Sequence, residues 1–169
     1  AERFIPFSIA NRGDAQQQTI IETFTDLLGL PQSRFDAETI MRLLECTAIQ
    51  SEFRLDHTDL DTIRGWLRET QIRWGLDGND KQALGLPAMD ANTWRAGLDR
   101  LLLGYALPPA ERDQWQLFNA QLPVGGISGD RAQLMAQLNA FIDQLSLLRN
   151  ELKRPRTPAD WQILLMDWL

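Results

Sequence analysis

Ile72-Arg73-Trp74-Gly75-Leu76-Asp77 opens the stretch that decides the fold of this 169-residue chain. The stretch passes through Leu84-Gly85-Leu86-Pro87 and closes with Thr93-Trp94-Arg95-Ala96-Gly97-Leu98-Asp99-Arg100-Leu101-Leu102-Leu103-Gly104-Tyr105-Ala106. Two motifs therefore each set a tryptophan beside an arginine, and a loop broken by Pro87 separates them. Asp77-Gly78 marks a turn within this loop.

The second motif predicts the central helix of the chain, from Thr93 to Tyr105. Arg95 and Asp99 lie four residues apart on one side of this helix, where we expect a surface ion pair. The apolar residues recur at helical spacing on a single face, and they are Trp94, Leu98, Leu101, Leu102 and Tyr105.

Helical periodicity continues on the N-terminal side of this stretch. The first helix follows Ala15 and ends at Gly29 and Pro31. Asp36 is the expected N-cap of a second helix. Thr58 and Asp61 have the spacing of a capping box for a third. The apolar residues of these helices are Ile20, Ile21, Phe24, Leu27 and Leu28, then Ile40, Leu43 and Leu44, then Leu60, Ile63, Trp66 and Leu67.

Helices also follow the stretch. Pro108-Pro109 ends the central helix and starts one that carries Trp115, and a glycine-rich loop spans Pro123 to Gly129. Thr157-Pro158-Ala159-Asp160 has the N-cap signature of the last helix, which carries Trp161, Leu164, Leu165 and Trp168.

The longest predicted helix runs from Ser128 to Lys153. Its apolar residues alternate spacings of four and three, as in a heptad seam. We favour packing within one bundle over an intermolecular coiled coil, which stays an alternative. The seam consists of Leu134, Leu138, Phe141, Leu145, Leu148 and Leu152.

Together these patterns predict an all-α fold, an irregular bundle of six to eight helices. Residues 15–169 form one helical domain, and residues 1–14 form an extended lead-in. Pro6 allows residues 4–9 at most a short edge strand, and we expect a turn at Asn11-Arg12-Gly13-Asp14.

Composition limits the possible functions. Hydrophobic content of 44% and charged content of 24% are ordinary for a globular domain. A net charge of −6 argues against a broad basic face that grips phosphates. The single Cys46 cannot form an internal disulfide, and no apolar run approaches the ~20 residues that span a bilayer.

The motifs predict no catalytic residue, no metal site and no cofactor. Gly125-Gly126-Ile127-Ser128-Gly129 lacks the lysine of a phosphate-binding loop and is followed by Asp130. Asp77-Gly78-Asn79-Asp80 lacks the glycine and glutamate of a calcium loop. His57 is the single histidine, lies at a polar helix start and has no nucleophile partner.

Arginines beside tryptophans are the remaining candidate contacts. An exposed aromatic beside an arginine can stack bases and hold phosphate in single-stranded DNA. The favoured alternative is that Trp74 and Trp94 are buried anchors, whose arginines cap carbonyls or pair with Asp77 and Asp99. Trp66, Trp161 and Trp168 are expected in the core. The candidates for contact with DNA or a partner are Arg64, Arg68, Arg73, Trp74, Arg95 and Arg100.

The two tryptophan motifs resemble a signature of the RecC family, the gamma subunit of bacterial exodeoxyribonuclease V (RecBCD). The signature reads I-R-W-G-(I/L)-D, a variable loop with L-P, then T-W-R-x-G and L-L-G-Y-A. Phe4–Arg12 and Leu27–Phe35 resemble two further family segments. The chain departs from the family pattern at Asn11, Gln16-Gln17-Gln18 and Ala96.

The resemblance implies a piece of a much longer subunit, similar to the helical subdomain inserted in superfamily 1 helicases. It implies a non-catalytic domain that scaffolds the complex or guides DNA in double-strand break repair and homologous recombination. The implied partners are RecB-like and RecD-like subunits and single-stranded or forked DNA, in the bacterial cytoplasm and without a membrane. The nuclease and the motors belong to other subunits of that complex. The alternatives are a docking module without DNA contact and, less favoured, an enzyme with its own cleft.

Overall fold

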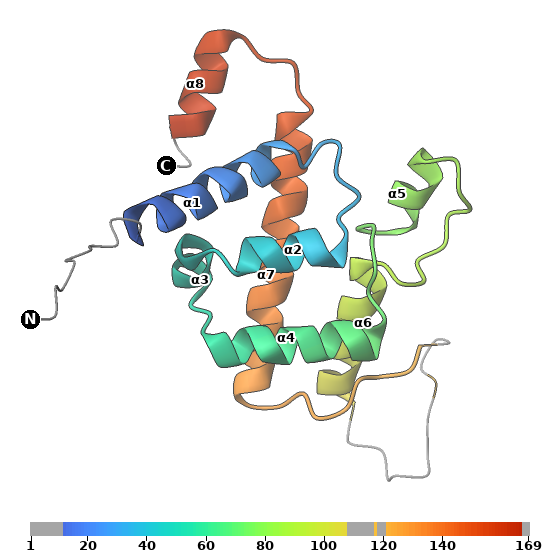
Figure 1. Cartoon of the computed structure of the whole chain (residues 1–169). Coiled ribbons are helices and arrows are strands. Elements are labelled where there is room, and N and C mark those ends of the chain that lie inside the picture. Colours follow the sequence, from blue (N-terminus) through green and yellow to red (C-terminus); the bar gives the residue numbers. More distant parts are fainter. Residues whose placement is uncertain (1–11, 108–116, 118–120, 167–169) are drawn as a thin grey trace, which may run out of the picture.

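The protein is an all-α bundle, as the sequence predicts (Figure 1). The computed structural model describes residues 12–107, 117 and 121–166. These residues form eight helices and no strand. The helices are α1 (Arg12–Leu28), α2 (Ala37–Leu44), α3 (Thr47–Phe53), α4 (His57–Thr70), α5 (Gly78–Ala83), α6 (Trp94–Ala106), α7 (Asp130–Leu152) and α8 (Pro158–Met166).

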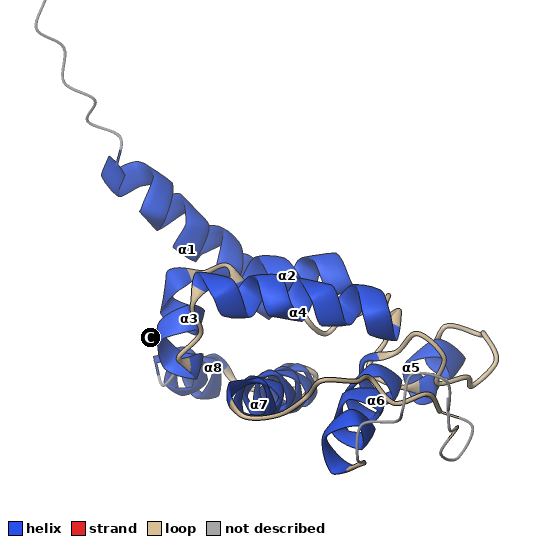
Figure 2. Ribbon diagram, turned by 90° about the horizontal axis from the view of Figure 1, so that it is seen from below, coloured by secondary structure: helices blue, strands red, loops and turns tan. Residues whose placement is uncertain are grey.

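The helices lie in two layers (Figure 2). One layer contains α1, α2 and α4, and the other contains α6 and α7, with α3 at one end. The core between the layers is apolar and includes Leu43, Ile63, Trp94, Leu101 and Leu138. Short loops join α2, α3 and α4, and α2 packs on both α3 and α4. Helices α2 and α4 lie over α7 (Figures 1 and 2).

The long helix α7 packs within the bundle along its heptad seam. Five of the six seam residues are buried, and Leu148 is partly buried against the same core. Phe141 meets Phe53 of α3 edge to face, with ring centroids 5.1 Å apart. This burial supports packing within one chain, since the seam is already covered by the domain's own helices.

Most of the predicted helix boundaries are confirmed, but one cap is wrong. Asp36 caps α2, and its Oδ1 accepts from the Thr39 backbone N at 2.9 Å. The capping box of α4 joins Asp56 and Asp59, not Thr58 and Asp61. Asp56 and Asp59 have the same spacing, and their carboxylates accept from each other's backbone N–H at 2.8 and 2.9 Å. Thr58 is already inside the helix, where its carbonyl accepts from Thr62.

Three further differences concern short or terminal segments. The turn predicted across residues 11–14 is wrong where it is described, because α1 begins at Arg12. Helices α3 and α5 were not predicted, because with seven and six residues both are too short to show a clear apolar period. The lead-in over residues 4–9, the helix with Trp115, and Trp168 lie outside the described residues.

The predicted apolar face of α6 is only partly buried. Trp94, Leu98 and Leu101 are in the core, whereas Leu102 is 53% exposed and Tyr105 is 55% exposed. Leu102 is turned about 100° from Leu101 around the helix axis, and Tyr105 lies in the last turn. Only the first two turns of α6 therefore supply core residues on this face.

Candidate partner and nucleic-acid interface

Three separate segments meet where the two tryptophan motifs come together. We name residues 34–37, 72–76 and 92–95 the tryptophan junction. Its segments are joined through their backbones, as the edges of a sheet would be, although no strand forms. The bonds are Gly75 N to Arg34 O (2.8 Å), Ala37 N to Arg73 O (2.9 Å), Arg73 N to Asn92 O (2.9 Å), Trp94 N to Gly75 O (3.0 Å) and Arg95 N to Leu76 O (2.9 Å).

Trp94 is the buried anchor of this junction. Its side chain is 0% exposed, and its indole Nε1 donates to the Phe35 carbonyl at 2.8 Å. A buried indole N–H needs such an acceptor, because leaving it unpaired would carry a desolvation penalty. The buried interpretation is thus confirmed for Trp94, and this ring is unavailable for stacking on bases.

Trp74 differs from Trp94 because it is only half-buried. The buried Lys81 of α5 places its Nζ 5.3 Å from the Trp74 ring centroid, a cation–π distance. Lys81 also donates to the carbonyl of Ala91, which lies just before the second motif. Trp74 therefore has an internal cationic partner and keeps one part of its surface open.

Two glycines of α6 allow this close packing. A Cβ on Gly97 would lie 2.2 Å from the Ile72 side chain, and one on Gly104 would lie 1.6 Å from the Val124 carbonyl oxygen. Both distances are impossible for real atoms, so only glycine allows these neighbours at these positions. The spacing within T-W-R-x-G and L-L-G-Y-A therefore has a packing cause.

A buried ion pair closes the junction from the side of α7. Arg149 Nη1 donates to both Asp80 carboxylate oxygens, at 3.0 and 2.8 Å, and its side chain is only 9% exposed. Asp80 Oδ2 also accepts from the Leu76 backbone N at 2.8 Å. The Arg149 guanidinium lies over the Phe35 ring at 4.5 Å. Sequence reasoning missed this pair, because no local signal links residues 69 positions apart.

Arg100 points into the protein. Its Nε donates to the Leu122 carbonyl at 2.7 Å, and Nη1 donates to the Thr70 and Glu69 carbonyls at 3.0 and 3.3 Å. The last two carbonyls belong to the end of α4, where unpaired carbonyls favour a cation. Arg100 thus joins α4, α6 and the loop before α7.

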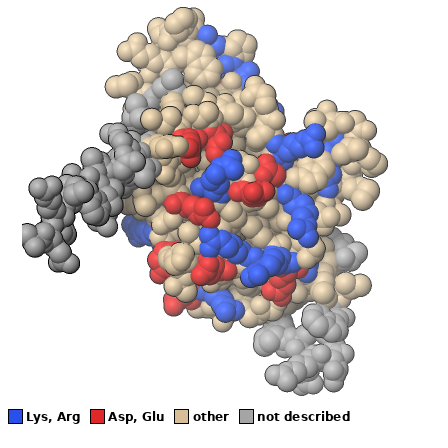
Figure 3. Space-filling model, viewed as in Figure 1, with Lys and Arg blue, Asp and Glu red and all other residues tan. Residues whose placement is uncertain are grey.

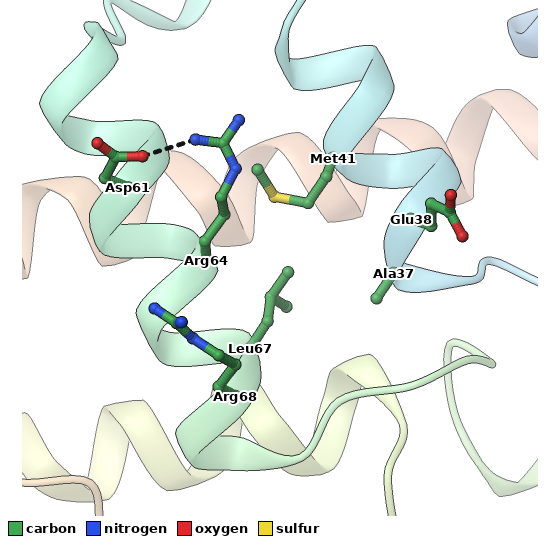
Figure 4. A pocket seen from close by; sticks show the side chains of 7 residues that line it. All are labelled: Ala37, Glu38, Met41, Asp61, Arg64, Leu67 and Arg68. Atoms are coloured by element: carbon green, nitrogen blue, oxygen red, sulfur yellow. Dashed lines mark hydrogen bonds and ion pairs between the residues drawn. The ribbon is translucent and has the colours of Figure 1, made fainter.

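Arg64 and Arg68 border a shallow groove between α2 and α4 (Figure 4). The groove has a volume of about 540 Å³, and Met41 and Leu67 supply its apolar side chains. Arg64 bonds Glu45 at 2.6 Å and Asp61 at 2.7 Å. The hydrogen bond to Glu45, followed by that to Asp61, raises the pKa of Arg64 above its ordinary value. Its charge is therefore already matched by carboxylates.

The other candidates have weaker internal partners. Arg95 lies 3.7 Å from Asp143 of α7 (Nη2 to Oδ1), and this ion pair replaces the predicted pair with Asp99. Arg73 is exposed and donates to the Gln71 side chain at 3.2 Å. Arg68 is exposed and makes no ion pair with any residue the structure describes. Arg68 and Arg73 are thus the two candidates most open to a ligand.

The candidates do not form one basic patch. In Figure 3 lysines and arginines alternate with carboxylates over the face that carries α2 and α4. Asp26 pairs with Arg42 on this face at 2.9 Å, and Glu38 borders the groove opposite Arg68. Interleaved carboxylates weaken the attraction of a phosphate backbone.

Neither a cluster of metal ligands nor a membrane-spanning helix is found in the described part of the chain. Within it, no three His, Cys, Asp or Glu side chains are grouped as metal ligands would be. A second hollow of about 380 Å³ lies beside α5, where Asp90 Oδ1 accepts from the Gly78 backbone N at 2.7 Å. None of the described helices has the length and apolarity needed to cross a bilayer.

The fold and these contacts define a helical domain whose charged side chains mainly bind its own elements. Comparison with known proteins then gives the family. Residues 17–169 match the family model described as RecBCD enzyme subunit RecC fourth domain, and the chain belongs to this family.

Curated relatives agree with this assignment. The RecBCD enzyme subunit RecC of Escherichia coli (strain K12) is 36% identical over 169 residues, which are 100% of this chain and 15% of that protein. The RecC of Buchnera aphidicola subsp. Acyrthosiphon pisum is 31% identical over 166 residues, with shares of 98% and 15%. That of Mycobacterium tuberculosis (strain CDC 1551 / Oshkosh) is 30% identical over 153 residues, with shares of 90% and 14%. The chain therefore spans about 15% of the length of the relatives it matches.

Proposed function

We propose that this chain is a non-catalytic structural domain of RecC, in a RecBCD complex that acts in double-strand break repair and homologous recombination. Its role there is to hold a fixed shape between neighbouring parts of the complex, in the bacterial cytoplasm. The family match over residues 17–169 supports the placement in RecC. RecB-like and RecD-like subunits are the expected partners.

One observation carries the structural role: the best arginine and tryptophan candidates are used inside the domain. Trp94 is fully buried, Arg100 donates to three carbonyls, and Arg64 is matched by two carboxylates. A protein that grips single-stranded DNA instead presents aromatic rings and free cations along an open groove. The geometry therefore favours scaffolding over strand guiding.

Strand guiding is the second candidate, and it depends on Arg68 and Arg73. Both side chains are exposed, and neither bonds a carboxylate of the residues that the structure describes. Ala37 lines the groove with Arg68, and its backbone N bonds the Arg73 carbonyl at 2.9 Å. The two arginines thus lie near the same end of the α2–α4 groove, where they could hold a phosphate or two.

The test replaces both arginines in full-length RecC assembled with RecB and RecD. We expect Arg68→Ala with Arg73→Ala to leave the affinity for forked DNA, its salt dependence and subunit assembly unchanged. Lys153→Ala with Arg154→Ala is the matched control, since it also removes two positive charges, at exposed positions just after α7. A weaker affinity and a shallower salt slope in the first variant alone would establish strand guiding.

A further inference from the structure

Helix α1 carries an apolar face that the domain covers only at one end. Ile20, Phe24 and Leu27 follow one line along the helix, with Ile21 and Leu28 beside them. Leu27 packs against the core, whereas Ile20 is 49% exposed and Ile21 is 65% exposed. The face that contacts the core at Leu27 is therefore still half-buried at Phe24, and it becomes exposed one turn further out, at Ile20 and Ile21.

The arrangement of the helices explains this exposure. Helix α1 packs on α2, and Asp26 near its end pairs with Arg42 at 2.9 Å. Its first half extends past the other helices (Figure 2). On the opposite side of α1, Glu22 accepts from the Gln18 side chain at 3.0 Å. The helix thus has a polar side suited to water, and an apolar side whose outer half, at Ile20 and Ile21, is exposed beside the described residues.

We propose that another domain of the same RecC polypeptide docks on this apolar face of α1. The inference rests on the proposed function, because it needs the chain to be a domain of RecC. The E. coli relative aligns with this whole chain, and the match occupies only 15% of that protein. Most of a RecC subunit therefore lies outside this domain and is tethered to it. A tethered surface binds at high effective concentration, so a small apolar contact suffices.

The surface that docks there must itself be mainly apolar. The exposed side chains of α1 on this face are aliphatic, and a charged group placed against them would lose its hydration without a partner. Contiguous apolar patches on a protein surface mark interaction sites, whereas single exposed aliphatic side chains are ordinary, and Ile20 and Ile21 are neighbours on α1.

Hydrogen exchange of the α1 amides in full-length RecC tests this proposal. We expect these amides to exchange about tenfold more slowly in full-length RecC alone than in the 169-residue chain. Ile20→Gln with Ile21→Gln should remove the difference, because glutamine keeps helix propensity and loses the apolar contact. Glu22→Gln, on the opposite side of α1, is the control and should leave the protection intact.

The other outcomes overturn the proposal. Equal exchange in full-length RecC and in the chain would mean that no RecC domain covers α1. Protection that appears only after RecB and RecD are added would assign the face to a partner subunit. Protection that depends on the concentration of the chain alone would assign it to a second copy. Failure of the proposed function would show separately, as weaker forked-DNA affinity of the Arg68→Ala, Arg73→Ala variant with α1 still protected.

Discussion

The tryptophan junction and helix α1 are both built from apolar residues at helical or motif spacing, yet they end in opposite environments. In the junction, Trp94 and Phe35 are fully buried, and backbone hydrogen bonds join three segments. On α1, Ile20 and Ile21 are about half or more exposed. The difference teaches that the junction is self-contained, whereas the α1 face needs more chain than this domain supplies.

The largest predicted effect is that of Trp94→Ala. This variant removes a fully buried ring and leaves the Phe35 carbonyl without its donor. We expect a loss of about 3–5 kcal/mol in the free energy of unfolding, measured by urea denaturation. A variant that unfolds like the wild type would show that the junction is not the centre of stability.

A smaller loss is expected from Gly104→Ala. Its new methyl group would overlap the Val124 carbonyl, so the loop must move away from α6, at a cost of about 2–3 kcal/mol. Gly65→Ala on α4 is the control, because nothing lies within 4 Å of a Cβ there. That control should gain about 1 kcal/mol from helix propensity. Equal shifts in melting temperature for both variants would contradict the packing argument.

Arg149→Met tests the side of the junction that faces α7. Methionine fills similar volume but leaves Asp80 with only the Leu76 backbone N–H among the bonds that fix it here. We expect a loss of about 2 kcal/mol, below the usual cost for a buried pair because Asp80 is 23% exposed. A double-mutant cycle with Asp80→Asn measures the coupling energy between the two side chains. A coupling energy near zero would show that the ion pair does not stabilise the junction.

The α1 variant Ile20→Gln with Ile21→Gln should have almost no effect on the 169-residue chain. Both side chains are exposed, Ile20 by about half and Ile21 by more, so the free energy of unfolding should change by less than about 0.5 kcal/mol. Urea denaturation beside Trp94→Ala gives the direct contrast. A loss approaching that of Trp94→Ala would show that this domain covers α1 by itself.

The smallest effect concerns acid and the start of α8. Hydrogen bonds from Thr157, first from its hydroxyl and then from its backbone N–H, lower the pKa of Asp160. Because the folded pKa is below the unfolded one, this contribution is complete above pH ~4 and is lost as pH falls through the folded value. Lower protection factors of the α8 amides in acid, after correction for the intrinsic pH dependence of exchange and absent in Asp160→Asn, are the expected result. A pH-independent difference would contradict it.

Local signals predicted much of the fold. The predicted N-caps at Asp36 and Thr157 follow from side chains that bond nearby backbone groups, so sequence neighbours suffice to find them. The heptad seam of α7 likewise identified its buried face. The Asp56–Asp59 capping box was missed although its spacing was visible, because Thr58 gave a competing signal.

Long-range contacts could not be predicted in this way. The partners of Arg100 and Arg149 lie 22 to 69 positions away, and nothing in their own sequence neighbourhoods identifies them. Tyr105 lies on the same predicted helix face as Trp94, yet Tyr105 is exposed and Trp94 is buried. Residue spacing predicts which face of a helix is apolar, but it does not predict how far the neighbouring helices extend along that face. Prediction was least successful for the candidate site, because an arginine beside a tryptophan gives the same sequence pattern whether its side chain contacts DNA or a backbone carbonyl.

The central claim is that Trp94, Arg64 and Arg100 stabilise the domain through internal contacts, and that the domain does not bind DNA. Fluorescence anisotropy of labelled single-stranded and forked DNA, titrated with the 169-residue chain at low and moderate salt, tests it most directly. We predict no saturable binding even at low salt, where phosphate contacts are strongest. Saturable binding that weakens with salt and with Arg68→Ala or Arg73→Ala would contradict the claim and make the α2–α4 face a strand path.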